Sequence, residues 1–238
     1  MKALSDYTPA RVQLGAAGGS LPAKPLLELR LAHARARDAV QFPLDTTSLS
    51  REMSQRNWIS RGLHSMARNR TEYLQRPDKG RQLDDASAAE VLRYKQPSPL
   101  TIVIADGLSA LAVHRHTVPF LEQTFQCGLS APAGPMWLVS QARVAIGDHV
   151  GELLKAELVI VIIGERPGLS TPDSLGVYLT WNPRRGRRDS ERNCISNIHA
   201  QGLSYDCAAA KLVFLAKEAQ RRQLTGVQLK DTQDQLLS

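Results

Sequence analysis

The feature that most constrains the fold is an apolar run at residues 158–163, Leu-Val-Ile-Val-Ile-Ile, which leads into the turn Gly-Glu-Arg-Pro-Gly at residues 164–168. Most of its side chains are β-branched, and an unbroken apolar run of this length predicts a strand buried on both faces. Such strands are typical of parallel sheets covered by helices. Open α/β sheets bind ligands beyond the carboxyl ends of these strands, so the polar turn is a candidate ligand site.

Further strand patterns alternate with helical patterns in the second half of the chain. Apolar stretches predict strands at residues 100–105, 136–146 and 176–181. Apolar residues at helical spacing predict helices over residues 109–126, after Gly147-Asp148, and after Ser204, which is suited to cap a helix. This alternation predicts an α/β fold with a Rossmann-like layered parallel sheet.

The first part of the chain has a different pattern. Ser20-Leu21-Pro22 predicts a helix start, with a capping hydroxyl and a proline in the first turn. Residues 44–70 predict a second helix with few large apolar residues, which would need a partner surface to be stable. The prolines of Gln96-Pro97-Ser98-Pro99 mark a boundary. We therefore expect a small helical N-terminal region at residues 1–96, whose basic first helix is either solvated or docks on another subunit, followed by a Rossmann-like domain at residues 97–238.

Composition argues against several classes of protein. The three cysteines are far apart and form no C-x-x-C pair, which argues against a disulfide framework or a zinc site and fits a reducing cytosol. A formal net charge of +7 favours an anionic partner or an acidic protein surface. The basic run at residues 184–188 lacks interleaved aromatic residues, so we favour a solvated loop or a protein contact over nucleic acid. No apolar stretch reaches the roughly 18 residues of a membrane helix, so we expect no membrane span.

Three polar stretches are candidates for binding. Asp106-Gly107-Leu108-Ser109 and the turn at residues 164–168 both follow predicted strands, and together they predict a binding crevice. The stretch Cys194-Ile195-Ser196-Asn197-Ile198-His199 holds a Cys/His pair that would suit a thiol nucleophile. No oxyanion hole or orienting partner can be assigned to that pair, so pocket-lining hydrogen-bonding groups are the favoured interpretation. No G-x-G-x-x-G joins a strand to a helix, which argues against a nicotinamide cofactor.

Histidines offer no clear metal site. The spacing of His114, His116 and His149 matches no zinc signature, and we expect surface positions for all of them. The sequence therefore predicts no metal ligand.

Taken together, these motifs resemble the small (light) subunit of ethanolamine ammonia-lyase, an adenosylcobalamin-dependent enzyme. The resemblance runs from about Arg11 to about Ala219. Besides the three polar stretches, it includes Leu-Ala-His-Ala-Arg-Ala-Arg-Asp-Ala-Val at residues 31–40 and Tyr-Leu-Gln-Arg-Pro-Asp-Lys-Gly-Arg at residues 73–81. Several motifs in the same order are far more specific than any single short pattern.

The resemblance implies a division of labour between two chains. In that family the large subunit is a TIM barrel that binds ethanolamine and carries the catalytic residues, and the small subunit covers the cobalamin, which is bound base-on between the chains. Ethanolamine is converted to acetaldehyde and ammonia by a radical mechanism. The resemblance implies a hetero-oligomer of several small–large pairs in the cytoplasm, either free or inside a bacterial microcompartment. The alternative is a non-catalytic binding module or structural subunit for another nucleotide-like ligand.

The resemblance also implies that three residues contact the cofactor, and it implies no catalytic residue in this chain. The three residues that would contact the cofactor are Val144, at the end of the predicted strand 136–146, Glu165 in the polar turn, and Cys194. Carboxylate, thiol and backbone groups can hold the amide side chains of a cobalamin without taking part in the chemistry, which the cofactor carries. Second-rank candidates for the same pocket are Asp106, Ser109, Arg166 and Asn197.

Overall fold

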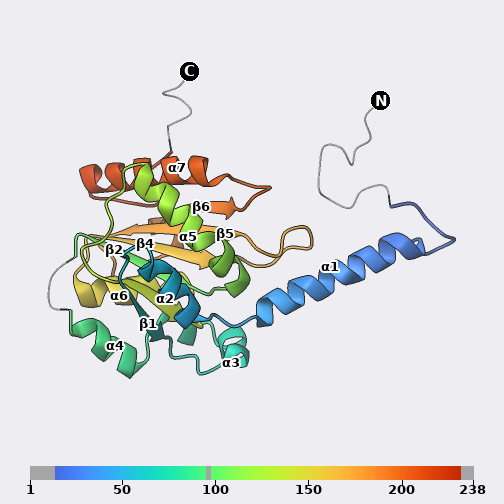
Figure 1. Ribbon diagram of the computed structural model, residues 1–238, viewed down its shortest axis with the longest axis horizontal. Helices are drawn as coiled ribbons and strands as arrows, with labels where there is room; N and C mark the ends of the chain where they lie inside the picture. Colours follow the sequence, from blue (N-terminus) through green and yellow to red (C-terminus); the bar gives the residue numbers. More distant parts are fainter. Residues whose placement is uncertain (1–13, 95–97, 232–238) are drawn as a thin grey trace, which may run out of the picture.

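The structure, a computed structural model, describes residues 14–94 and 98–231. It contains a six-stranded sheet in the order β1-β3-β2-β4-β5-β6, with helices on both faces (Figure 1). The strands are β1 (Ser60–His64), β2 (Leu100–Ala105), β3 (Met136–Ser140), β4 (Leu158–Gly164), β5 (Leu175–Trp181) and β6 (Asn193–Ile198). The helices are α1 (Ala23–Gln41), α2 (Thr46–Ser54), α3 (Arg70–Gln75), α4 (Asp85–Leu92), α5 (Ala110–Gln126), α6 (Ile146–Leu154) and α7 (Tyr205–Arg222), with short 3-10 helices η2 (Lys79–Arg81) and η3 (Asp189–Glu191). The predicted α/β class is confirmed.

The predicted strand at residues 158–163 is β4, and it is buried along its whole length. It runs parallel to β2, and β2 and β1 each run parallel to β3. The expected parallel sheet is wrong at the other edge, because β5 is antiparallel to both β4 and β6. Residues 165–174 join β4 to β5 without a helix, and a parallel neighbour would need a long crossover connection.

The predicted helix at residues 44–70 is wrong beyond its first turns. Helix α2 ends at Ser54, and β1 then forms the edge of the sheet beside β3. The N-terminal region is therefore not wholly helical, since it contributes a strand to the same sheet as the rest of the chain. The proposed boundary residues Gln96 and Pro97 lie outside the described residues. The division into a docking region and a cofactor domain stays a prediction.

The predicted side-chain cap is present at the start of α7 but absent at the start of α1. The Ser204 hydroxyl accepts a hydrogen bond from the Cys207 N–H at 3.3 Å and caps α7, as predicted. Helix α1, in contrast, has Pro22 at its N-cap position and no side-chain cap, while Ser20 pairs with Ala17 through the backbone. The proline alone therefore marks the start of α1.

Two hydrophobic cores lie on opposite faces of the sheet. Leu158, Ile160 and Ile162 of β4 pack in one core with residues of α2, α5 and α7. The alternate residues Val159, Val161 and Ile163 pack in the other core, with residues of α4 and α6. We call these the α7 face and the α6 face, and Figure 1 shows α7 above the sheet and α4 below it. This double burial explains why β4 carries no polar residue.

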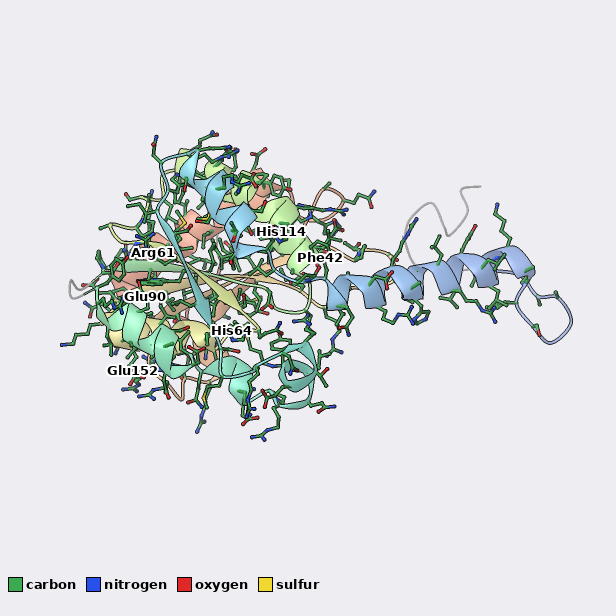
Figure 2. The ribbon with its side chains drawn as sticks, turned by 60° about the horizontal axis from the view of Figure 1, so that its bottom comes forward. Phe42, Arg61, His64, Glu90, His114 and Glu152 are labelled. Atoms are coloured by element: carbon green, nitrogen blue, oxygen red, sulfur yellow. The ribbon has the colours of Figure 1, made fainter. Side chains whose placement is uncertain are left out.

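Helix α1 extends away from the sheet as an arm (Figure 1). It is attached near its C-terminal end, where Phe42 packs edge-on against His114 of α5 with ring centroids 6.0 Å apart (Figure 2). Only Ala32 and Ala39 of α1 are buried, whereas Leu27 and Leu31 are 63% and 50% exposed. An isolated helix of this length is marginal in water, so α1 presents apolar surface that needs a partner. No helix within residues 14–94 and 98–231 is long and apolar enough to cross a membrane.

Candidate functional site

The two polar turns expected to bracket a crevice lie directly against each other. The Leu108 N–H donates to the Gly164 carbonyl oxygen at 3.0 Å. A Cβ added at Gly164 would come within 2.0 Å of the Ser109 carbonyl oxygen, so only glycine fits there. The turns are neighbours, as predicted, but the expected crevice between them is wrong because their backbones fill the space.

Two of the second-rank candidates are used to hold loops in place. The buried Asp106 carboxylate accepts hydrogen bonds from the backbone N–H groups of Gln141 and Ala142, each at 2.8 Å. The buried Ser109 hydroxyl caps α5 and donates to the Pro172 carbonyl oxygen at 3.0 Å. Burial raises the pKa of the Asp106 carboxyl, although both backbone donors oppose that shift. Neither polar group is left for a ligand.

Glu165 follows β4, and one oxygen of its half-buried carboxylate is fixed. Its Oε2 accepts hydrogen bonds from the Ser174 hydroxyl at 2.7 Å and from the Asn197 N–H at 3.1 Å. A Cβ on Gly176 would lie 3.0 Å from Oε1 and 3.3 Å from the Tyr178 ring, so glycine makes room for both side chains. Within the described residues, Oε1 has no hydrogen bond. It is therefore available to accept one from a ligand.

Cys194 is exposed on β6 and lies opposite Tyr178 of β5, with its thiol in hydrogen-bond contact with the phenol. Although the residue as a whole is exposed, partial desolvation of its thiol by neighbouring atoms raises the thiol pKa, the Tyr178 hydrogen bond opposes the rise, and the charge of Glu165 adds to it. The thiol is therefore protonated at neutral pH. His199, the base that a nucleophilic Cys194 would need, contacts the Asn197 Oδ1 at 2.9 Å instead. This geometry supports a binding role for Cys194 and not a nucleophilic one.

Val144 lies in the loop between β3 and α6, because β3 ends at Ser140 and not at residue 146 as predicted. It is half-buried and packs on the core of the α6 face, and so does Tyr178. Glu165 lies on this face too, since a Cβ on Gly176 would meet both its side chain and the Tyr178 ring. The structure thus brings all three predicted contacts to one face of the sheet. Sequence reasoning missed Tyr178, although its alternation with the buried Val177 could have revealed it.

The α6 face is open over β6 and beside Tyr178 of β5, whereas Gly176 and Thr180 of β5 are buried. Helix α6 packs on β2 and β4, whereas α7 packs on the opposite face of β5 and β6. Cys194 is accordingly exposed, and Tyr178 is only half-buried. A broad ligand could lie on this surface, which we call the open α6 surface and define by Val144, Glu165, Tyr178 and Cys194.

A basic cavity of about 490 Å³ adjoins Val144. Its wall includes Asp189 and five arginines, namely Arg81, Arg143, Arg187, Arg188 and Arg192. Two of the five have carboxylate partners, because Arg187 pairs with Glu191 and Arg192 with Asp148. The cavity, which we call the arginine cavity, is suited to an anionic group. Sequence reasoning noted the basic run at residues 184–188, which supplies Arg187 and Arg188, but it did not predict the cavity because the other three arginines come from other segments.

Two of the three histidines are not at the surface as expected, whereas His114 is partly exposed. His116 and His149 are buried, and His149 Nδ1 accepts a hydrogen bond from the Leu83 N–H at 3.1 Å. His116 Nδ1 lies 2.6 Å from the Tyr205 hydroxyl. Both rings connect neighbouring segments of the fold. In the described part of the chain, no group of three or more His, Cys, Asp or Glu residues could hold a metal ion.

Comparisons with known proteins point to one family. The family model described as ethanolamine ammonia-lyase light chain (EutC) matches residues 1–230. A protein of Pseudomonas fluorescens (strain Pf0-1), named ethanolamine ammonia-lyase small subunit, is 54% identical over 235 residues, covering 96% of this chain and 85% of its own length. Proteins of the same name from Pseudomonas aeruginosa (strain LESB58) and Pseudomonas putida (strain W619) are 53% and 51% identical, each over 96% of this chain and 86% of their own length.

Proposed function

Because this chain belongs to the family of ethanolamine ammonia-lyase light chains, we propose that it binds adenosylcobalamin on the open α6 surface and covers it against a large subunit. The complex would convert ethanolamine to acetaldehyde and ammonia. The observation that carries the proposal is the common location of Val144, Glu165 and Cys194 on the α6 face, beside a part of the sheet on which none of the described helices is packed. A broad, nearly planar ligand needs such a surface.

Glu165 is the main hydrogen-bonding group toward the cofactor. The Ser174 hydroxyl and the Asn197 N–H hold its Oε2, so the carboxylate keeps its orientation when a ligand arrives. Its Oε1 would accept a hydrogen bond from an amide side chain of the corrin ring. A charged acceptor makes a stronger hydrogen bond than a neutral one, so this contact would contribute strongly to retention of the cofactor.

Cys194 and Val144 complete the contact. The protonated Cys194 thiol and the Tyr178 phenol present weakly polar surface, and Val144 presents an apolar edge supported by the core beneath it. The arginine cavity beside Val144 fits the phosphodiester, the negatively charged group in the cobalamin's nucleotide loop. These residues bind and orient the ligand and exclude water from one side of it.

The adenosylcobalamin, when bound, supplies the radical that begins the reaction on ethanolamine. We assign the residues of the open α6 surface to binding and not to proton transfer, because the cofactor would occupy the Glu165 Oε1, the Ser174 hydroxyl holds its Oε2, and a raised pKa keeps the Cys194 thiol from acting as a base at neutral pH. The catalytic residues would therefore lie on the large subunit, which would also cover the exposed face of α1.

Reconstitution tests the proposal. The purified chain, a large subunit and adenosylcobalamin are mixed, and acetaldehyde release and bound cofactor are measured after gel filtration. We expect activity only with both chains, and we expect Glu165→Ala to weaken cofactor retention more than subunit assembly. Glu218→Ala, on α7 at the opposite face of the sheet, is the matched control and should retain both properties. Equal loss of retention and assembly in Glu165→Ala would contradict the binding role.

A further inference from the structure

A second cavity, of about 590 Å³, lies at the amino ends of β1, β2 and β3, opposite the strand end that carries Glu165. We call it the amino-end cavity. Its lining includes Ile59, Arg61, Tyr94, Thr101, Trp137 and Leu154. Its volume is within the range of about 300–1,000 Å³ that small-molecule sites occupy. It shares no lining residue with the open α6 surface or the arginine cavity.

Two residues on the wall of this cavity each carry a buried polar atom without a hydrogen-bond partner. Thr101 of β2 is 2% exposed and Trp137 of β3 is 1% exposed. Within the described residues, neither the Thr101 Oγ1 nor the Trp137 Nε1 has a partner. A buried polar group without a partner destabilises a protein by about 1–3 kcal/mol, so two of them in one cavity wall point to a ligand that pairs with them.

The rest of the wall combines apolar surface with one cation. The Tyr94 ring packs edge-on against the Trp137 ring, with centroids 5.2 Å apart, and Leu154 closes the same side. Arg61 donates to the Ser60 carbonyl oxygen at 3.1 Å, and the described residues give it no carboxylate partner. Arg93, also on the wall, pairs with Glu90 at 2.8 Å and is less available. Figure 2 shows Arg61 and Glu90 at the side of the molecule away from α1.

We propose that the amino-end cavity binds a small aromatic or aliphatic acid. The apolar body of the ligand lies against Tyr94, Trp137 and Leu154, and its acidic group pairs with Arg61. The Thr101 hydroxyl and the Trp137 N–H donate to oxygen atoms of the ligand. The site is separate from the proposed cofactor surface, so it stands or falls independently of that proposal.

The test uses the full-length chain and 1-naphthoate as the probe, with methyl 1-naphthoate as its neutral analogue, and measures binding by calorimetry. We expect saturable binding of 1-naphthoate with a dissociation constant below about 1 mM. Arg61→Gln should weaken naphthoate binding about tenfold, because it removes a charge-assisted hydrogen bond, and should leave the ester within about twofold of wild type. Arg81→Gln, in the arginine cavity, is the matched control and should bind the probe like wild type.

Thr101→Val separates binding from folding. Valine keeps the shape of threonine and removes the unpaired hydroxyl, so the variant should be as stable as wild type or more stable while it binds both probes about fivefold more weakly. The proposal is overturned if wild type shows no saturable binding, or if Arg61→Gln and Arg81→Gln have the same effect. It is also overturned if Thr101→Val binds like wild type.

Discussion

Arg192 and Asp148 form a buried, two-point ion pair that joins η3 and β6 to the first turn of α6. The two terminal guanidinium nitrogens of Arg192 donate to the two carboxylate oxygens of Asp148, each at 2.6 Å, and both side chains are 2% exposed. Arg192 also donates to the Thr180 hydroxyl and to the Arg187 carbonyl oxygen. The pair therefore positions the loop that contributes three of the arginines to the arginine cavity.

Removing one partner of this pair should destabilise the fold strongly. Arg192→Met leaves the Asp148 carboxylate buried without its counterion, which lowers the free energy of unfolding by about 3–5 kcal/mol. Urea denaturation measures the change. Arg221→Met breaks an exposed pair with Glu218 and should change stability by no more than about 1 kcal/mol. Similar losses of unfolding free energy in both variants would show that the buried Arg192–Asp148 pair contributes no more to stability than an exposed pair.

Gly176→Ala should weaken cofactor binding without unfolding the chain. The new methyl group would lie 3.0 Å from the Glu165 Oε1 and 3.3 Å from the Tyr178 ring, so both side chains must shift by a few tenths of an ångström. Equilibrium dialysis of the complex with adenosylcobalamin should show a loss of affinity of about threefold to tenfold, in line with a packing change of roughly 1 kcal/mol. Gly19→Ala, which has open space around it, is the control. Unchanged affinity in Gly176→Ala would argue against Glu165 as a contact.

Stability should fall as the pH is lowered below about 6.5. Burial lowers the pKa of His114, His116 and His149 below the usual value of 6.5. The unfolded chain therefore takes up protons first as the pH falls, so stability that is complete above pH 6.5 is lost toward the lower folded-state pKa values. The melting temperature between pH 7.5 and 5 measures this loss.

A His149 variant tests how much of this dependence of stability on pH comes from His149. His149→Asn keeps an acceptor near the Leu83 N–H and removes the titrating ring, so the fall in melting temperature should be shallower than in wild type. Nearby Arg185 lowers the pKa of His149 and Glu152 raises it, and both groups remain in the variant. His33→Asn, on the exposed arm α1, is the matched control and should retain the wild-type slope. An unchanged slope in His149→Asn would assign the effect to other groups.

Two leucines of α1 should contribute to assembly and not to folding. Leu27 and Leu31 are one helical turn apart and are 63% and 50% exposed. Changing both to Gln should weaken binding to the large subunit by about tenfold or more, since buried apolar anchors dominate interfaces, and should barely change the melting temperature. Surface plasmon resonance measures the affinity. Val227→Gln, at a site 72% exposed near the C-terminal end of the described chain, should bind normally. Normal binding by the double variant would exclude these leucines from the interface.

Local patterns in the sequence determined the elements whose structure depends mainly on their own residues. The run at residues 158–163 specified β4 because an apolar strand of that length is stable only between two covering layers. Ser204 specified the start of α7 because its hydroxyl pairs with a free N–H of the first turn. The motifs also identified the family and selected Val144, Glu165 and Cys194.

Only the tertiary structure decided how these pieces meet. It turned β5 antiparallel, added β1 at the sheet edge, closed the space between the Gly107 and Gly164 turns, and moved Val144 from a strand into a loop. It also gathered the arginine cavity and the amino-end cavity from distant segments. The polar turn after β4 remains a ligand site, but its Glu165 faces the open α6 surface and not a crevice. The physical reason is that a hydrophobic pattern records how deeply a segment is buried, whereas strand direction, open surface and pairing of polar groups depend on which segments become neighbours.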